Sequence, residues 1–488
     1  MQPAIFQLKL AVYLAGFATA VASSASTPDF GAIECYLRAE MELNRIPGLS
    51  LGVVKDGQVV WTKAYGVSSL ATRAPMSPDT PVELASLSKS FTALAVFQLQ
   101  SEGRLNLERS VASYLPEFRT GAGRASDQIT VRHLLEHRSG LTRRDDTLLP
   151  CCEQPGESDL VTAVRRLRQV HPRRNPGTAF QYANSNYVLL AAVVEQASGR
   201  AFADYMEERV FAPLGMTRTT LHRKQAQAWG LASLHERAWG QMRVSNSRFT
   251  GWPGSSQVKS TAGDMTRYLA ATMGGSFHGA PRGAGEWESA SCAPYCWGWF
   301  VQPRAGWLNG EVVLHHTGDI WGGNTAAVLA PRSGLGVVVL LNSGANRAGE
   351  IARAVIMRAA GLAGPQAGAT PWTKTPDNWA MCFTLAAGVL LAGLLAYLRS
   401  AWRELRHGQR TLVWKGERVR AMRAVFLFCL AAYLLYLLLG GSRPPVSHLP
   451  QSLKIGIYSL GGVSAALLLA TAVLGMAPRS QSKAPAGD

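Results

Sequence analysis

Three long apolar stretches near the end of the chain limit what it can fold into. They cover residues 379–398, 424–441 and 455–476 and contain no Asp, Glu, Lys or Arg. A helix needs about 20 apolar residues to cross a bilayer, and inside the bilayer its backbone groups satisfy one another. We therefore predict three transmembrane helices within 379–476, followed by a tail at 477–488.

The charges around these stretches predict their orientation. The loop at 399–423 carries eight Lys and Arg side chains against two Glu, which favours the cytoplasmic side. At the other end, residues 1–22 have the pattern of a cleaved secretory signal, with an uncleaved N-terminal anchor as the alternative. Both signals predict a bacterial inner-membrane protein with a periplasmic domain at 23–360. The segment 361–378, rich in Gly, Ala, Pro and Thr, is the predicted linker.

The high positive charge does not require a nucleic-acid partner. The formal net charge is +17, but 13 of the 49 Lys and Arg residues lie in the signal or after residue 378. The smaller positive net charge of residues 23–378 is typical of a solvated basic surface on an exported domain. The partners we expect are a small-molecule or peptide substrate and the lipid bilayer, and the sequence makes no prediction of oligomeric state.

Five cysteines fall in the predicted exported domain, where the environment is oxidising. They are Cys35, Cys151, Cys152, Cys292 and Cys296, an odd number that cannot all pair within the chain. The Cys151-Cys152 pair and the segment from Cys292 to Cys296 are expected to staple loops, with a link between the two groups as one arrangement, and spacing leaves the connectivity open. A zinc site is the alternative, although no His stands at ligand spacing beside them.

A serine followed three residues later by a lysine marks the candidate catalytic centre. Ser86 lies where a helical stretch begins, and Lys89 projects from the same face. The helix dipole favours an oxyanion beside Ser86, and a partly desolvated Lys89 can share in activating its hydroxyl. The same spacing recurs at Ser256–Lys259 and Ser480–Lys483, so the pattern needs support from its surroundings.

A second candidate group is a turn that leads into the apolar helix predicted at 188–198. Tyr182 beside a lysine ammonium would have a lowered phenol pKa and could accept the serine proton, while Asn184 could offer its amide to a substrate carbonyl. The alternative is a packed aromatic and an Asx cap. Upstream, His133 and His137 lie one helical turn apart in a short helix capped by Thr130. Packing is the favoured interpretation over metal binding, because no third ligand is evident.

The third group ends an apolar segment that begins at Val312. Gly318 would let a substrate backbone approach an edge strand, and the Asp319 N–H could join that of Ser86 in an oxyanion hole. Alternating and apolar patterns predict further elements. These are a helix at 31–45, a hairpin at 51–65 with an Asp56-Gly57 turn, adjacent antiparallel strands at 312–319, 324–330 and 336–341, and a closing helix at 347–360.

Together the three groups resemble a known family. Ser86-Leu-Ser-Lys89, Tyr182-Ala-Asn184 and His316-Thr317-Gly318 stand in the order of the motifs of class C serine β-lactamases, D,D-peptidases and related esterases. The resemblance covers roughly residues 30–360. It implies an α+β fold of the β-lactamase/transpeptidase type, in which helices flank an antiparallel sheet and a helical subdomain lies between the first two motifs.

The resemblance also implies an acyl-enzyme mechanism without metal or cofactor. Ser86 would attack a carbonyl, Lys89 and Tyr182 would pass its proton to the leaving group, and Asn184, His316, Thr317, Gly318 and Asp319 would bind substrate. The reaction we expect is peptidase or amidase action on substrates containing D-amino acids. The alternatives are a β-lactamase, an esterase and a non-catalytic penicillin sensor.

Two features qualify the implied substrate. His316 replaces the lysine that opens the third motif in β-lactamases, and Asp319 stands where a small neutral residue is usual. The layout of signal, hydrolase and three spans is similar to that of the colibactin-maturing peptidase and its relatives, which remove an N-acyl-D-asparagine prodrug group. Those enzymes would have serine where this chain has Asn184.

Overall fold

The computed structural model describes most of the chain up to the predicted membrane region. The described residues are 28–118, 126–149, 160–168, 170, 172–238, 241–245, 251–275, 284–288, 291–369, 376–407, 410–412 and 476–478. The predicted signal, the second predicted span, Cys151, Cys152 and nearly all of the third predicted span lie outside them. The α+β class is confirmed, because a large antiparallel sheet is combined with separate helices.

Seven strands form the central sheet, in the order β2-β1-β11-β10-β9-β8-β7. Every pairing is antiparallel. The strands are β1 Gly48–Lys55, β2 Gln58–Gly66, β7 Tyr295–Cys296, β8 Trp299–Ala305, β9 Glu311–Ile320, β10 Gly323–Ala330 and β11 Leu335–Leu341. The predicted hairpin and the three adjacent strands are confirmed. Chain reversal at the hairpin falls at Asp56, whose φ of 50° a short polar residue tolerates.

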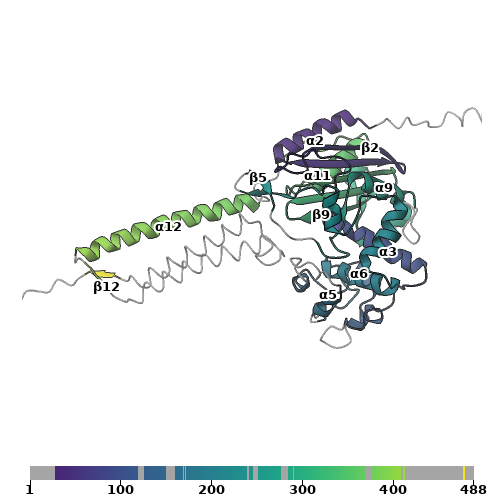
Figure 1. Ribbon diagram of the computed structural model, residues 1–488, viewed down its shortest axis with the longest axis horizontal. Helices are drawn as coiled ribbons and strands as arrows, with labels where there is room; N and C mark the ends of the chain where they lie inside the picture. Colours follow the sequence, from purple (N-terminus) through teal and green to yellow (C-terminus); the bar gives the residue numbers. More distant parts are fainter. Residues whose placement is uncertain are drawn as a thin grey trace, which may run out of the picture.

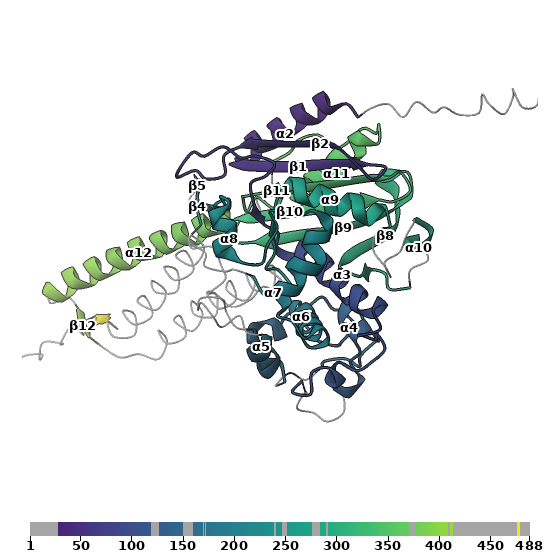
Figure 2. The ribbon, with the colours of Figure 1, turned by 45° about the vertical axis from the view of Figure 1, so that its right-hand side comes forward.

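Alternating side chains bury both faces of the sheet. On β11, Val337, Val339 and Leu341 contact one core, whereas Val338 and Leu340 contact the other. The period of two follows from the pleat. Helices α2 Phe30–Asn44 and α11 Ala348–Ala359 cover the first face, and α9 Ala262–Met273 packs on the second, so three layers result (Figures 1 and 2).

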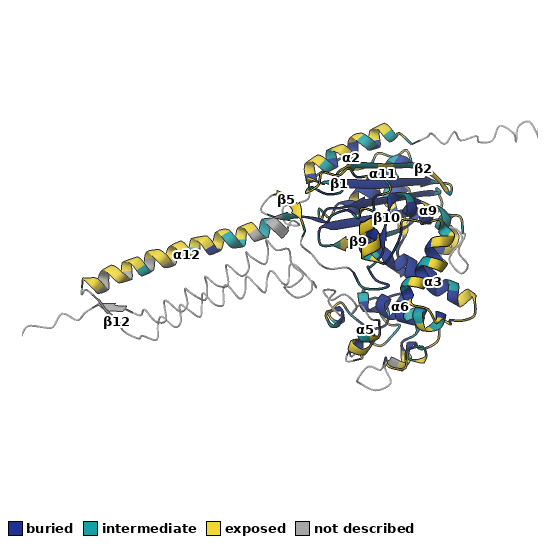
Figure 3. Cartoon of the chain, viewed as in Figure 1, coloured by how far each residue is buried: buried dark blue, intermediate teal, exposed yellow. Residues whose placement is uncertain are grey.

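A helical region continues from the second face. Its centre is the pair α3 Ser88–Ser101 and α6 Asn184–Ser198, both largely buried (Figure 3). Around them lie α4 Val131–Leu135, α5 Leu160–Leu167, α7 Phe202–Tyr205 and α8 Arg223–Ala228; α10 Ala284–Glu288 lies against β8 and β9. The elements that the structure describes between Ser86 and Tyr182 are helices and 3₁₀ turns, as the resemblance implied.

Short strands and one long helix complete the described chain. The strand pairs are β3 Val82–Glu83 with β6 Lys259–Ser260, β4 His235–Ala238 with β5 Gln241–Val244, and β12 Arg410–Leu412 with β13 Met476–Pro478. Helix α12 Pro376–Arg406 includes the first predicted span. Its stretch from Met381 to Ser400 is apolar enough to cross a membrane, and its described side chains are mostly exposed (Figure 3).

A buried ion pair joins the first and last helices of the domain. Arg347, which precedes α11, donates through Nε and Nη2 to the two carboxylate oxygens of Glu40 on α2, at 3.0 and 2.7 Å. Glu40 is fully buried, and it also accepts hydrogen bonds from Asn44 and from the backbone N–H of Gly368. The first part of the predicted linker is therefore held against α2 and does not hang free.

We expect Glu40→Gln to destabilise the domain by about 1–3 kcal/mol, because it leaves the buried Arg347 guanidinium with only the exposed carboxylate of Glu350 as its counter-charge. Urea unfolding followed by tryptophan fluorescence measures this. Glu34→Gln on the same helix is the matched control, since its pair with Arg38 is largely solvated and contributes little. Equal effects of the two substitutions would contradict the role assigned to the buried pair.

Candidate active site

Ser86 lies in a single turn of 3₁₀ helix, η1 Ala85–Leu87, directly before α3. The sequence predicted a helix start here, and the structure shows that the serine precedes the α-helix itself. Ala85 has a φ of 50°, a left-handed conformation that costs energy for a residue with a Cβ. Strain of this kind persists where the surroundings enforce it, and it is common at functional sites.

Two hydrogen bonds, from separate segments of the chain, hold the residues before Ser86. The Leu84 N–H donates to the Val258 carbonyl at 2.9 Å, and the Thr325 hydroxyl donates to the Leu84 carbonyl at 2.8 Å. Gly318 packs against the same carbonyl, since a Cβ built on it would lie 2.1 Å from Leu84 O. The expectation that Gly318 makes room for a substrate is therefore corrected: its missing side chain makes room for the turn that carries Ser86.

Lys89 is fully buried, and its Nζ connects the parts of the site. It lies 3.1 Å from Ser86 Oγ, 2.8 Å from Asn184 Oδ1, and 3.0 Å from both the carbonyl and the hydroxyl oxygen of Ser255. Burial lowers the pKa of Lys89 well below its usual value, Asp146 opposes this shift and the charge of Arg143 adds to it. A neutral amine has a lone pair that can take the proton of Ser86.

Tyr182 stands on the other side of the amine, with Lys89 Nζ 4.9 Å from its ring centroid. Burial raises the phenol pKa, and hydrogen bonding to Ser86 opposes that shift only in part. The sequence-based expectation of a lowered pKa is therefore wrong, because desolvation outweighs the hydrogen bond to Ser86 and the charge of Arg143. Tyr182 stays protonated at neutral pH, so it can give a proton to a leaving group, while Lys89 is the better base.

Asn184 positions Lys89 within the protein. Its Oδ1 accepts from Lys89 and from the Ser255 hydroxyl, and its Nδ2 donates to Asp146 Oδ2 at 3.1 Å. The amide oxygen and one of the two amide hydrogens are thus used within the protein, and contact of the other hydrogen with a substrate carbonyl stays a prediction.

Asp146 is a site residue that the sequence analysis missed. Its carboxylate accepts the backbone N–H groups of Asn184 and Ser185 at 3.0 and 2.8 Å, and so caps the start of α6 from a distant loop. Burial raises its pKa to about 6, while these hydrogen bonds and Lys89 oppose the shift. No motif marked Asp146 or Ser255, because both come from loops without periodic pattern.

His316 is buried beside Tyr295. Its Nδ1 donates to the Thr317 carbonyl at 2.8 Å, so Nε2 accepts from the Tyr295 hydroxyl at 3.0 Å. Burial, with Lys89 as a second cause, lowers the pKa of His316 to about 3. A neutral imidazole whose two nitrogens are both engaged within the protein is not arranged to bind a substrate, which is the role that the resemblance implied.

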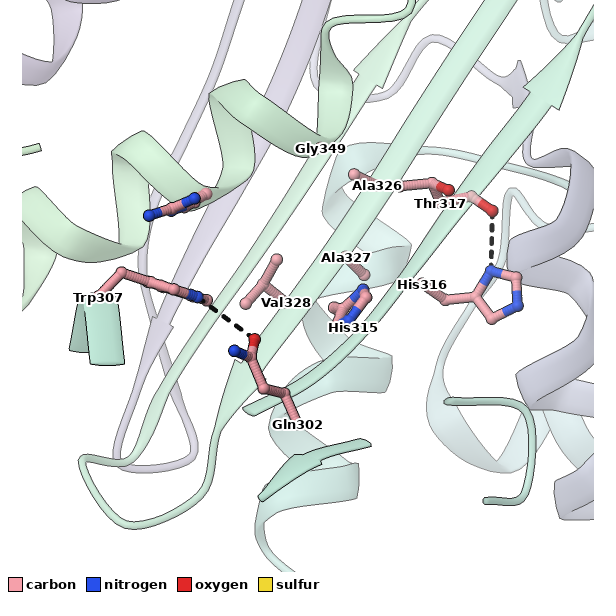
Figure 4. A pocket seen from close by; sticks show the side chains of 10 residues that line it. Gln302, Trp307, His315, His316, Thr317, Ala326, Ala327, Val328 and Gly349 are labelled. Atoms are coloured by element: carbon pink, nitrogen blue, oxygen red, sulfur yellow. Dashed lines mark hydrogen bonds between the residues drawn. The ribbon is translucent and has the colours of Figure 1, made fainter. Parts of the chain in front are cut away.

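The side chains of Thr317 and Asp319 alternate with His316 and Gly318 along β9. Thr317 lines a pocket on the α11 face of the sheet, together with Gln302, Trp307, His315 and Gly349 (Figure 4). Asp319 Oδ1 accepts from Asn324 Nδ2 at 2.9 Å. The Thr317 side chain therefore lies outside the cluster around Lys89, whereas the charge of Asp319 is among the influences that raise the pKa of Tyr182. The Asp319 N–H as an oxyanion donor stays a prediction.

The edge of β9 beside Ser86 is not paired with strand β8. Strand β8 pairs with β9 only as far as His315, and β9 then runs alongside η1. Among the described strands none pairs with this edge between Thr317 and Ile320. An extended substrate backbone could add to it next to the nucleophile.

The repeated Ser-x-x-Lys pattern at Ser256 has a structural explanation. Lys259 is fully buried, donates to the Gln257 carbonyl at 2.7 Å and lies 3.6 Å from Glu83 Oε2. Ser256 Oγ instead accepts from the Trp252 N–H. The other repeat, Ser480–Lys483, lies outside the described residues.

The other histidines and cysteines are also placed. His133 Nδ1 completes a capping box with Thr130, and His137 is buried among the rings of Tyr182, Tyr187 and Tyr295. Cys292 and Cys296 form a disulfide with each other, and Cys35 is free. Across the part of the chain that the structure describes, no three His, Cys, Asp or Glu side chains are grouped as metal ligands.

Comparisons with known proteins agree with this geometry. The family model described as Beta-lactamase matches residues 33–362. Protein flp of Staphylococcus aureus (strain MW2) is 25% identical over 449 residues, covering 88% of this chain and 87% of its own length. A D-aminopeptidase of Brucella anthropi is 34% identical over 198 residues, covering 40% of this chain and 36% of the peptidase.

Solved structures show the same fold. The octameric penicillin-binding protein homologue from Pyrococcus abyssi superimposes with a TM-score of 0.60 at 24% identity, covering 73% of this chain and 81% of that one. A beta-lactamase/D-alanine carboxypeptidase from Pseudomonas syringae gives a TM-score of 0.54 at 23% identity, covering 68% and 98%.

We predict that Gly318→Ala slows reaction at Ser86 by about 100-fold, because the new Cβ pushes the Leu84 carbonyl and the nucleophile out of position. The rate of labelling by a fluorophosphonate measures this. Gly306→Ala is the matched control, since nothing lies within 4 Å of its added Cβ. If the two variants label at the same rate, the close approach does not position Ser86.

Asp146 should give stability a specific pH dependence. Its pKa of about 6 lies above the usual 3.8, so the folded protein holds this proton more tightly than the unfolded chain. Its contribution is complete below pH 3.8 and is lost as the pH rises through 6, a change of about 3 kcal/mol. Urea unfolding between pH 4 and pH 7 should show this loss relative to Asp146→Asn. A difference between the two proteins that does not vary with pH would contradict it.

Proposed function

The chain belongs to the beta-lactamase family, and from this premise we propose that it is a membrane-anchored serine hydrolase with Ser86 as its nucleophile. The observation that carries the proposal is the buried amine of Lys89, 3.1 Å from Ser86 Oγ and beside Tyr182. Its lowered pKa makes Lys89 a base, and its raised pKa keeps Tyr182 protonated as an acid, so both groups needed for proton transfer lie beside Ser86.

In the proposed reaction, the lone pair of Lys89 takes the Ser86 proton while Oγ forms a bond to the substrate carbonyl carbon. The tetrahedral intermediate collapses as the bond to the leaving group breaks, and Tyr182 gives its proton to that group. The proton on Lys89 then restores Tyr182. Water attacks the acyl-enzyme, returns a proton to Ser86 Oγ and releases the acid.

We propose peptides or amides containing D-amino acids as substrates, either peptidoglycan-type peptides or an N-acyl-D-amino-acid prodrug group. Two observations support this choice. The D-aminopeptidase of Brucella anthropi is similar over a segment of the chain, and the open edge of β9 suits an extended backbone. His316, where β-lactamases have lysine, argues against a lactam as the main substrate.

A panel of substrates tests this function. We expect sustained turnover of D-configured peptide amides at least ten times faster than of their L-isomers or of β-lactams, measured as product per enzyme over time. Turnover confined to lactams or to esters would assign the chain to β-lactamases or esterases. One acylation per molecule without release would instead indicate a penicillin sensor.

The membrane anchor is part of the same proposal. Three observations support it. The first is the apolar stretch of α12, and the second is the pairing of β12 with β13, which brings the basic loop beside the end of the third apolar stretch. The third is the match to flp, which covers 88% of the chain and so continues beyond residue 362. The domain before α12 would be periplasmic, and the loop at 399–423 cytoplasmic.

Reporter fusions test this topology. An alkaline phosphatase fused after Ala369 should be active, because it would be exported, whereas the same enzyme fused after Gly408 should be inactive. A cytoplasmic reporter at the two positions is the control and should give the opposite pattern. Phosphatase activity only after Gly408 would overturn the orientation.

A further inference from the structure

A loop beside the site, residues 141–149, is closed on itself and tied to α6. Asp145 Oδ2 accepts the backbone N–H and the hydroxyl of Thr142 at 2.6 and 2.9 Å. Asp146 accepts the N–H groups at the start of α6. Arg143 and Arg144, which lie between Thr142 and Asp145, therefore project from a backbone of defined position. Both side chains are exposed.

Arg143 is directed toward the reacting groups. Its Cζ lies 5.2 Å from the ring centroid of Tyr182, whose hydroxyl is hydrogen-bonded to Ser86. Its positive charge adds to the lowering of the pKa values of Lys89 and His137, and it opposes the rise that burial causes in the pKa of Tyr182. Arg144 is among the causes of none of these shifts, so the two neighbouring arginines are electrostatically distinct.

Within the described residues, no carboxylate lies at ion-pair distance from Arg143. A cation that contacts the general acid of a hydrolase and has no carboxylate partner in the described part of the chain is suited to bind an anion that arrives with the substrate. A purely structural stacking of Arg143 on Tyr182 does not account for this position, because the same positive charge also lowers the pKa of Lys89.

We infer that Arg143 determines specificity by binding a free carboxylate of the substrate while the scissile carbonyl lies at Ser86. The inference rests on the proposed serine hydrolase and narrows its substrates to acyl donors that carry a carboxylate a few bonds from the reacting carbonyl. The guanidinium would hold that carboxylate at the rim, beside Tyr182. Binding there would orient the leaving group toward the tyrosine hydroxyl.

Two fluorophosphonates of the same length, one ending in a carboxylate and the other in the isosteric carboxamide, test the inference on the full-length protein. The measured quantity is the ratio of their second-order labelling rates. We expect wild type to prefer the carboxylate about three- to ten-fold, with a preference that shrinks as salt is added. The ratio cancels any effect of Arg143 on the reactivity of Ser86, which both probes share.

Arg143→Gln should bring the ratio to about 1, Arg143→Lys should retain part of it, and Arg143→Glu should invert it. Arg144→Gln is the matched control and should keep the wild-type ratio. A wild-type ratio of 1, or an equal loss in Arg144→Gln, would overturn the inference while leaving the hydrolase intact. Absence of labelling by both probes would instead overturn the proposed nucleophile, and this inference with it.

Discussion

The buried amine of Lys89 is the interaction on which the rest of the site depends. Its four neighbouring oxygen atoms come from the turn before α3, from the start of α6 and from the loop that carries Ser255. A charge in such a place is expensive, so the environment favours the neutral amine. The same burial that would destabilise a structural lysine therefore gives the serine a base.

Charged and polar groups around the amine adjust its basicity in opposite directions. Asp146, held at the start of α6, favours the ammonium, and Arg143 opposes it. His137 and His316 are both kept neutral by burial and so add no fixed charge beside Lys89. On the far face of the sheet, Glu40 holds α2, Arg347 and Gly368 together.

Local pattern was sufficient for the elements and for the central residues. Apolar segments separated by turns predicted the strands around β11, and the motifs that carry Ser86, Lys89 and Tyr182 predicted three side chains that the fold brings together. Roles that depend on long-range packing could not be predicted. The pKa of Tyr182 rises because of burial, Gly318 faces Leu84 and not a substrate, and Asp146 reaches α6 from a loop with no motif.

The pH dependence of Ser86 labelling by a neutral fluorophosphonate tests the role of Lys89 most directly, with Ser86→Ala as background. If the buried amine is the base, the wild-type rate levels off well below 10.5, the usual lysine pKa. Lys89→Arg, which stays charged throughout, should lose most of this rate at neutral pH. A wild-type rate that climbs until about pH 10, or a Lys89→Arg variant that labels as fast as wild type, would contradict the account.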